Sequence, residues 1–389
     1  CIMAGVDQLI QYLNNLSFTK SDIKYLEEKN IFSKEFLDYL RNFKFECDVW
    51  AIPEGNPVFP NQPLVTVKGP VVQAQFVETM ILLTINHQTL IATKANRICR
   101  AANGKTVMEF GSRRAQGYDG AIYGARASII GGCDSTACTI ADKYFNVPAV
   151  GTMAHSWVQL FDTEYEAFEA WAQTYPDNCS LLIDTYNVLK SGLPNAIKVF
   201  DKVLKPLGKR PKGIRIDSGD ITYLTKKCRK ILDEAGYNDC KIIVSNSLDE
   251  HIIRDVLSQG ACIDSFGVGE RLITAKSEPV FGGVYKLVAV EKESTIIPKI
   301  KISENSEKIT NPGFKKIYRL FDKSTDIAIA DVISLNDEQI DENSELEIFH
   351  PIHTWKRKKI TNFYAKELLV KIFEKGEQVY SSPSVLEIK

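Results

Sequence analysis

The sequence lacks the patterns that mark zinc sites, membrane spans and nucleic-acid binders. Its nine cysteines include no C-x-x-C pair, and its five histidines form no H-x-x-x-H or H-E-x-x-H motif. A structural zinc site and a zinc hydrolase are therefore not expected. No run of about 18 apolar residues occurs, so no membrane span is predicted. The 48 Lys and Arg balance 49 Asp and Glu, which argues against a dedicated nucleic-acid binder.

The overall composition is that of an ordinary globular protein. Hydrophobic residues make up 44% and charged residues 25%, which excludes disorder or a collagen-like structure for the whole chain. Scattered cysteines, and no basic segment leading into an apolar signal region, favour a cytoplasmic protein with reduced thiols. The 389 residues predict two to three domains, or one large barrel with additions, at roughly 100–200 residues per domain.

The middle of the sequence repeats one unit, a short apolar run followed by a helical stretch. Successive runs lie about 20–30 residues apart, the length of a β-strand plus a helix. This alternation predicts a parallel sheet with both faces covered, and seven units fit a closed barrel better than an open doubly wound sheet. No G-x-G-x-x-G follows a strand to support the open sheet. The runs are Thr106–Phe110, Ser128–Ile130, Pro148–Gly151, Ser180–Asp184, Gly213–Asp217, Lys241–Ser245 and Ile263–Val268.

The two ends of the sequence have a different texture. Residues 1–50 read as helices, with Ser21 and Asp22 as candidate caps, and residues 71–100 also look helical. Short apolar strings alternate with charged turns over residues 314–389 and predict a strand-rich region. We therefore expect an α/β barrel over residues 101–290. A second, α+β domain would be built from an N-terminal part, residues 1–100, and a C-terminal part, residues 291–389.

Charged and small residues gather where the predicted strands end, which is where parallel barrels carry their reactive groups. Arginines there suit phosphates or a carboxylate, and carboxylates could hold Mg²⁺ or stabilise a cationic centre. Taken alone, each has an ordinary interpretation, such as a surface ion pair, a helix cap or a structural histidine. Together they favour a phosphate-bearing sugar as substrate. The residues are Arg113, Arg114, Asp134, His155, Asp184, Arg215, Asp217, Asp220 and Gly267–Gly269.

Six strings in register resemble the nicotinate phosphoribosyltransferase family. They are Glu109–Gly117, Gly151–Ser156, Leu182–Tyr186, Ser191–Asn195, Arg215–Asp220 and Gly282–Val288. The resemblance implies a type II phosphoribosyltransferase fold, an irregular α/β barrel plus a domain built from both chain ends. It also implies transfer of phosphoribosyl from phosphoribosyl pyrophosphate to nicotinate, giving nicotinate mononucleotide and pyrophosphate for NAD synthesis. ATP as a co-substrate, Mg²⁺ and a homodimer with the site near the interface are further implications.

The resemblance also implies roles for individual residues. His155 matches the histidine that ATP phosphorylates. Thr152, Arg215 and Arg113 match positions that handle nicotinate, and His155, Arg215 and Asp217 are candidate catalytic residues. Asp217 and Asp220 are candidate metal ligands, and Glu270 departs from the Thr of many members. The residues matched to phosphate or phosphoribosyl pyrophosphate binding are Arg113, Arg114, Ser245, Asn246, Gly267, Gly269 and Glu270.

Other functions stay open on the sequence. Nicotinamide or quinolinate could replace nicotinate, although the Arg215 guanidinium suits a carboxylate better than a neutral amide. The chain could also be a catalytically silent, ligand-binding or regulatory homologue, against which the intact His155, Arg215 and Asp217 argue. A barrel aldolase would need a catalytic lysine at a strand end, and no lysine of the sequence stands clearly at such a position.

Overall fold

A computed structural model describes residues 1–302 and 311–389. The chain folds into two compact units. One unit joins residues 3–86 to residues 282–382, and the other holds residues 87–281 and 383–389. Helix α5 (Glu78–Ala101) continues through the division after residue 86, so no linker marks it in the sequence. The boundaries expected after residues 100 and 290 stay predictions.

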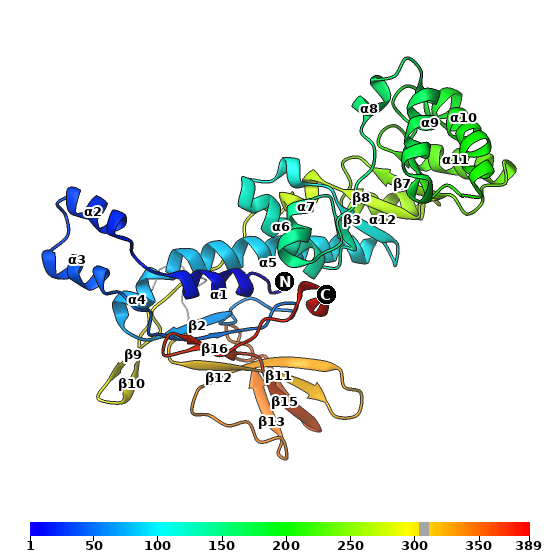
Figure 1. Ribbon diagram of the computed structural model, residues 1–389. Helices are drawn as coiled ribbons and strands as arrows, with labels where there is room; N and C mark the ends of the chain where they lie inside the picture. The colour runs from blue at the N-terminus through cyan, green and yellow to red at the C-terminus, as the bar shows by residue number, and fades with distance from the viewer. Residues whose placement is uncertain (303–310) are drawn as a thin grey trace. The chain divides into compact units, whose positions relative to one another are not determined.

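Strands from both ends of the chain share one sheet in the first unit. β1 (Asp48–Ala51) pairs antiparallel with β16 (Val370–Glu374), blue and red in Figure 1, in the order β17-β16-β1-β2. The other two strands are β2 (Val65–Lys68) and β17 (Glu377–Gln378). Buried residues from both ends, such as Val49 and Phe373, belong to one hydrophobic core. The prediction of a domain built from N- and C-terminal segments is confirmed.

The remaining strands of this unit form a three-stranded sheet and two hairpins. The apolar strings expected as strands after residue 314 lie in β11, β12 and β13. The sheet, ordered β12-β11-β15, holds β11 (Lys315–Asp322), β12 (Ala328–Leu335) and β15 (Phe363–Glu367). The hairpins are β9 (Ala289–Lys292) with β10 (Thr295–Pro298) and β13 (Leu346–Phe349) with β14 (Arg357–Ile360).

The first residues are helical, as expected, but the cap of the second helix differs from the expected one. The helices are α1 (Val6–Asn15), α2 (Lys20–Glu28), α3 (Lys34–Arg41) and, later, α4 (Val71–Phe76). Thr19 caps α2 by accepting the Asp22 N–H, and the Asp22 carboxylate accepts the Thr19 N–H in return. Asp22 therefore contributes to the cap as the third helical residue of a capping box, and Ser21 lies inside the helix.

A parallel sheet organises the second unit. Its order is β4-β3-β8-β7-β6-β5, and an isolated bridge from Thr136 to Ala149 adds a seventh segment beside β4. The first strand therefore pairs with the last, as in a barrel, whereas an open doubly wound sheet leaves its last strand at an edge. The strands are β3 (Thr106–Glu109), β4 (Ser135–Thr136), β5 (Ser180–Leu182), β6 (Gly213–Ile216), β7 (Lys241–Ser245) and β8 (Ser265–Val268).

One seam interrupts the circuit of strands. Within the described residues, no backbone pairing joins the segment at Ala149 to β5. The sheet thus has the irregular α/β barrel pattern expected, with strands paired everywhere except at this place. Thr152 and His155 follow the segment at Ala149 on one side of this seam, and Asp184 follows β5 on the other.

Helices connect the successive strands of this sheet, and the last two helices, α13 and α14, follow its last strand. They are α6 (Tyr118–Ile130), α7 (Thr139–Phe145), α8 (His155–Gln159), α9 (Glu164–Thr174), α10 (Leu193–Val199), α11 (Ile221–Glu234), α12 (Glu250–Ser258), α13 (Glu270–Ile273) and α14 (Val385–Ile388). Single 3₁₀ turns span Ser112–Arg114, Pro176–Asn178 and Lys205–Leu207, and π-turns span Val188–Gly192 and Phe200–Leu204. In the described part of the chain, no helix is both long and apolar enough to cross a bilayer.

The strand expected at Ser128–Ile130 is wrong, because these residues end helix α6. This half of the helix is buried continuously from Gly124 to Ile130, including the polar Arg126 and Ser128, so its polar residues do not mark an exposed face with a helical period. The strand of this unit is the short, polar Ser135–Thr136 instead. Because β4 begins only a few residues after the expected position, the spacing of successive strands still agrees with a repeated strand and helix unit.

Candidate active site

Arg215 is the centre of a polar cluster at the carboxyl ends of the parallel strands. It lies on β6, and its Nε donates to Ser245 Oγ at 2.9 Å at the end of β7. One terminal nitrogen donates to Thr152 Oγ1 at 2.6 Å, and the other donates to Asp217 Oδ1 at 2.9 Å. These bonds fix the guanidinium and leave one N–H on each terminal nitrogen for a ligand.

His155 faces two carboxylates across the seam of the barrel. Its Nε2 lies 3.8 Å from Asp184 Oδ1 and 3.7 Å from Asp217 Oδ2, and its Nδ1 lies 3.1 Å from Thr185 Oγ1. The ring is 40% exposed, whereas the Asp184 side chain is 1% exposed. Side chains thus connect the two strand ends that backbone pairing leaves apart, and the exposed ring can be reached by a ligand.

Asp184 shapes the loop that carries Asp217. Its Oδ2 accepts the Asp217 N–H at 2.9 Å and the Ser218 hydroxyl at 2.6 Å. Its Oδ1 is buried and has no hydrogen-bond partner among the described residues. A buried carboxylate oxygen without a donor is unfavourable, so it is suited to receive a ligand hydroxyl or a cation. The sequence analysis names Asp184 among the strand-end carboxylates without giving it an individual role, and it does not single out Thr185.

Arg113 and Arg114 lie in the 3₁₀ turn after β3, and both side chains are exposed. Glu109 anchors this turn: it is fully buried, accepts the Gly111 N–H and accepts the Thr136 hydroxyl at 2.6 Å. Burial raises the pKa of Glu109, against the lowering effect of these two hydrogen bonds. The two arginines are thus presented to solvent on an anchored turn.

The remaining expected residues lie at the same strand ends. Asp220 accepts the Tyr223 N–H at 2.9 Å and caps α11, while Asn246 is exposed. A Cβ atom at Gly267 would lie 2.6 Å from the Phe110 ring, and one at Gly269 would lie 3.0 Å from the Phe110 carbonyl. Packing therefore disfavours a side chain at both positions, because the Phe110 ring or carbonyl would have to shift. The Glu270 carboxylate lies 3.3 Å from Lys276 Nζ.

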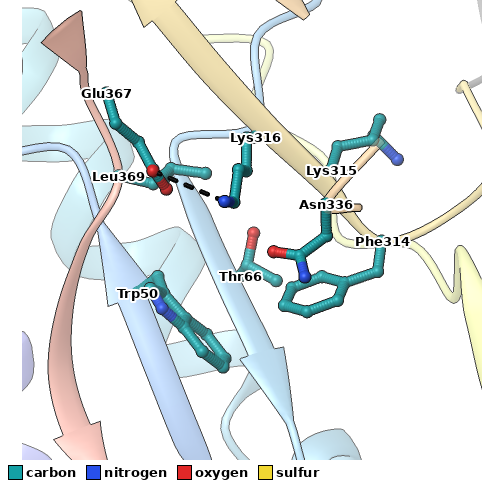
Figure 2. Close-up of a pocket in the computed structure, with 8 residues that line it drawn as sticks. All are labelled: Trp50, Thr66, Phe314, Lys315, Lys316, Asn336, Glu367 and Leu369. Carbon is teal, nitrogen blue, oxygen red and sulfur yellow. Dashed lines mark ion pairs between the residues drawn. The ribbon is translucent and has the colours of Figure 1, made fainter. Parts of the chain in front are cut away.

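A hollow in the first unit is too small for a pyridine substrate. It is lined by Trp50, Phe314 and Lys316, among others (Figure 2), and encloses about 10 Å³, about enough for one water molecule. Burial lowers the pKa of the neighbouring Lys315 to about 8. The chemistry that the sequence predicts is therefore concentrated in the cluster around Arg215 and His155.

Sequence comparison agrees with the predicted resemblance along nearly the whole chain. Residues 1–86 match the N-terminal domain of nicotinate phosphoribosyltransferase, residues 106–332 match the nicotinate phosphoribosyltransferase family, and residues 314–389 match its C-terminal domain. Nicotinate phosphoribosyltransferase of Bacillus subtilis is 47% identical over 390 residues, covering 100% of this chain and 79% of the relative. The Homo sapiens enzyme of that name is 30% identical, covering 90% and 75%.

Structural comparison gives the same family. The crystal structure of human nicotinic acid phosphoribosyltransferase matches with a TM-score of 0.86 and 27% identity, covering 100% of this chain and 84% of that one. A nicotinate-nucleotide pyrophosphorylase from Pyrococcus furiosus shares the fold, with a TM-score of 0.68 and 23% identity, covering 98% and 94%. The chain belongs to the nicotinate phosphoribosyltransferase family.

Proposed function

We propose that this chain transfers the phosphoribosyl group of phosphoribosyl pyrophosphate to nicotinate, giving nicotinate mononucleotide and pyrophosphate. The position of Arg215 is the main support. Three hydrogen bonds hold its guanidinium beside His155 and Asp217, with one N–H left on each terminal nitrogen. A planar fork of this kind matches the carboxylate of nicotinate, whereas the amide of nicotinamide offers a single oxygen acceptor.

The carboxylates of the cluster suit the transfer step. The pyridine nitrogen forms a bond to the anomeric carbon as the bond to pyrophosphate breaks, and positive charge develops on the sugar. Asp217 and the unpartnered Oδ1 of buried Asp184 are placed to stabilise that charge or to receive ribose hydroxyls. The strand-end loops at Ser245–Asn246 and Gly267–Gly269, with Arg113 and Arg114, would bind the phosphates.

Mg²⁺ fits this site as a companion of the substrate's phosphates. The described residues contain no group of three or more His, Cys, Asp or Glu side chains arranged to hold a metal ion. Mg²⁺ commonly takes one or two protein carboxylates and completes its shell with phosphates and water. Asp217 is the proposed carboxylate. Asp220 is already engaged as the cap of α11, although its second oxygen is available.

We also propose that ATP phosphorylates His155. When Nδ1–H donates to Thr185, Nε2 carries the lone pair that attacks the γ-phosphorus of ATP, and ADP leaves. A phosphoryl group on Nε2 would place negative charge beside Asp184 and Asp217, whose oxygens lie 3.8 and 3.7 Å from that nitrogen. Repulsion between these charges gives ATP a means of rearranging the site.

The test is an assay with phosphoribosyl pyrophosphate, Mg²⁺ and nicotinate, with and without ATP, measuring mononucleotide and ADP. We expect product that ATP increases, with ADP released. His155→Ala should abolish ADP release and ATP stimulation but keep weak transfer, whereas His350→Ala, in the other unit, should behave as wild type. Equal ATP stimulation in His155→Ala and wild type would contradict the role of His155.

A homodimer with the site near the interface is part of the proposal. Three large side chains that follow the strand-end loops are exposed: Tyr118, Leu160 and Tyr186. Single exposed apolar side chains are common on monomers, so the proposal of a second copy of this chain as the partner rests on the family resemblance. Light scattering on the full chain should give twice the monomer mass, and a monomer that is fully active would contradict this part.

A further inference from the structure

The loop that leaves β7 has a strained backbone. Asn246 and Ser247 follow Ser245 directly, and their φ angles are 107° and 49°. Side chains with a Cβ atom rarely adopt positive φ, and two such residues in succession persist only where the surroundings hold them. Ser245 itself contacts Arg215 and Asp217 in the cluster. The strained loop therefore begins at the site.

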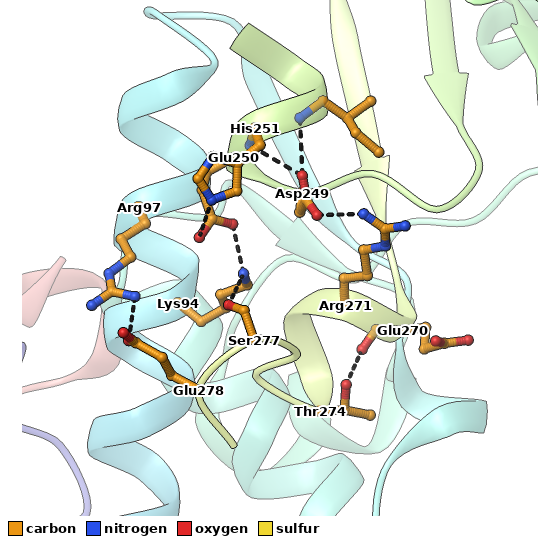
Figure 3. Close-up of polar contacts among 11 residues, drawn as sticks. Lys94, Arg97, Asp249, Glu250, His251, Glu270, Arg271, Thr274, Ser277 and Glu278 are labelled. Atoms are coloured by element: carbon orange, nitrogen blue, oxygen red, sulfur yellow. Dashed lines mark hydrogen bonds and ion pairs between the residues drawn. The ribbon is translucent and has the colours of Figure 1, made fainter. Parts of the chain in front are cut away.

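Asp249 fixes the far end of this loop and also reaches the next one. Its Oδ1 accepts the N–H groups of His251 at 3.0 Å and Ile252 at 2.9 Å, which caps α12. Its Oδ2 accepts a hydrogen bond from Arg271, on the first turn after β8 (Figure 3). One carboxylate thus joins the loop after β7 to the loop after β8.

A buried ion pair adds a second anchor. Lys94 Nζ on α5 lies 2.6 Å from Glu250 Oε2 at the start of α12, and the two side chains are 4% and 7% exposed. Ser277 Oγ lies 3.5 Å from the same Lys94 nitrogen, and Ser277 also has a positive φ, 93°. Figure 3 shows the pair of Lys94 with Glu250 beside the pair of Asp249 with Arg271. The two strand-end loops are therefore fastened to each other and to α5.

We propose that Asp249 and Arg271 are positioning residues, which hold the loops at Ser245–Ser247 and Gly267–Gly269 at the separation that one phosphate needs. This inference rests on the proposed function, in which both loops donate to a phosphate of phosphoribosyl pyrophosphate. Arg271 acts through Asp249 and does not touch the substrate. Ser245 is the last residue of β7 and keeps its contacts with Arg215 and Asp217 when the pair is lost, so the pyridine subsite keeps its form. The displaced residues are Asn246 and Ser247, and binding of the phosphoribosyl donor weakens.

The test compares Asp249→Asn with a matched control, Asp239→Asn. Asparagine still caps a helix but loses the ion pair, and Asp239 pairs with Arg210 elsewhere in the same unit. Asp249→Asn should raise the KM for phosphoribosyl pyrophosphate by about tenfold, while the KM for nicotinate changes by less than about twofold. Asp239→Asn should change neither. Arg271→Lys, which keeps a cation beside Asp249, should recover most of the loss that Arg271→Met causes.

Three results would overturn the inference. Equal changes in both KM values, or lower thermal stability with unchanged KM values, would mean a merely structural pair. A much larger effect of Arg271→Met than of Asp249→Asn would mean that Arg271 binds phosphate itself. If wild type makes no mononucleotide, calorimetry with phosphoribosyl pyrophosphate separates the two failures. If phosphoribosyl pyrophosphate binds wild type and binds Asp249→Asn more weakly, the positioning role stands without the transferase activity. If it does not bind wild type, both proposals are wrong.

Discussion

Substitution of Arg215 by lysine gives the sharpest prediction from the site. The guanidinium is held by Ser245, Thr152 and Asp217 and is 16% exposed. Lysine keeps the positive charge but has one nitrogen and no planar fork. The change therefore removes bidentate recognition of a carboxylate and leaves the charge balance of the cluster unaltered.

The expected loss follows from one charge-assisted hydrogen bond. Such a bond contributes about 1.5–3 kcal/mol, which corresponds to a roughly 10- to 150-fold weaker affinity for nicotinate. Arg215→Ala should lose at least as much, because it also removes the charge. Arg210→Lys, in an ion pair with Asp239 outside the cluster, is the matched control and should leave substrate binding unchanged.

The assay is steady-state kinetics in which nicotinate is varied at saturating phosphoribosyl pyrophosphate, with calorimetric titration of nicotinate beside it. Thermal unfolding of each variant shows whether loss of the contacts to Thr152 and Asp217 has also altered the fold. The reasoning predicts a raised KM for nicotinate in a folded protein. An unchanged KM for nicotinate with a raised KM for phosphoribosyl pyrophosphate would move Arg215 to the phosphate site.

Three further predictions concern buried groups. Lys94→Met should destabilise the protein by about 3–5 kcal/mol in urea unfolding, because Glu250 stays buried without its partner, and adding Glu250→Leu should restore part of the loss. Burial acts to raise the pKa of Asp249, but the N–H groups of Ile252 and His251 and the Arg271 guanidinium lower it overall. Its contacts should therefore stabilise the fold fully above about pH 4 and progressively less as pH falls through the lowered pKa, so the stability difference from Asp249→Asn should shrink only in acid. Burial raises the pKa of four thiols to about 12, so at pH 8 a thiol reagent should label exposed Cys1 quickly and these only on unfolding: Cys47, Cys179, Cys228 and Cys240.

A different result in each experiment would contradict the corresponding prediction. A Lys94→Met variant as stable as wild type would show that the pair is solvated. A stability difference for Asp249→Asn that stays constant down to pH 3 would place the Asp249 pKa at its unfolded value. Rapid labelling in the native state would mean that the unit holding the labelled thiol opens readily: the first unit for Cys47, and the second for Cys179, Cys228 and Cys240.

Strands with β-branched, continuously apolar sequences were predictable. Lys241–Ser245 was expected as a strand and is β7 residue for residue, because Ile242, Ile243 and Val244 fit a sheet covered on both faces. Ser128–Ile130 is a similarly apolar run, but it ends helix α6, whose C-terminal half is buried. A short apolar run does not distinguish these two environments.

The site was predictable where its residues lie at the carboxyl ends of the expected strands or within a few residues after them. Thr152, His155, Arg215, Asp217 and Ser245 were expected from the sequence, and the structure brings them together. The pairing of Asp249 with Arg271 could not be read in the same way, because it joins two loops whose separation depends on the order of strands in the sheet. Sequence spacing alone carries no such information.

Substrate choice is the most direct test of the account. Nicotinate, nicotinamide and quinolinate would each be offered to the full chain with phosphoribosyl pyrophosphate and Mg²⁺, with and without ATP, and mononucleotide would be measured. The fork at Arg215 predicts product from nicotinate, with nicotinamide used at least about tenfold less efficiently. Equal use of nicotinamide, or product from quinolinate alone, would contradict the central claim that this site recognises the carboxylate of nicotinate.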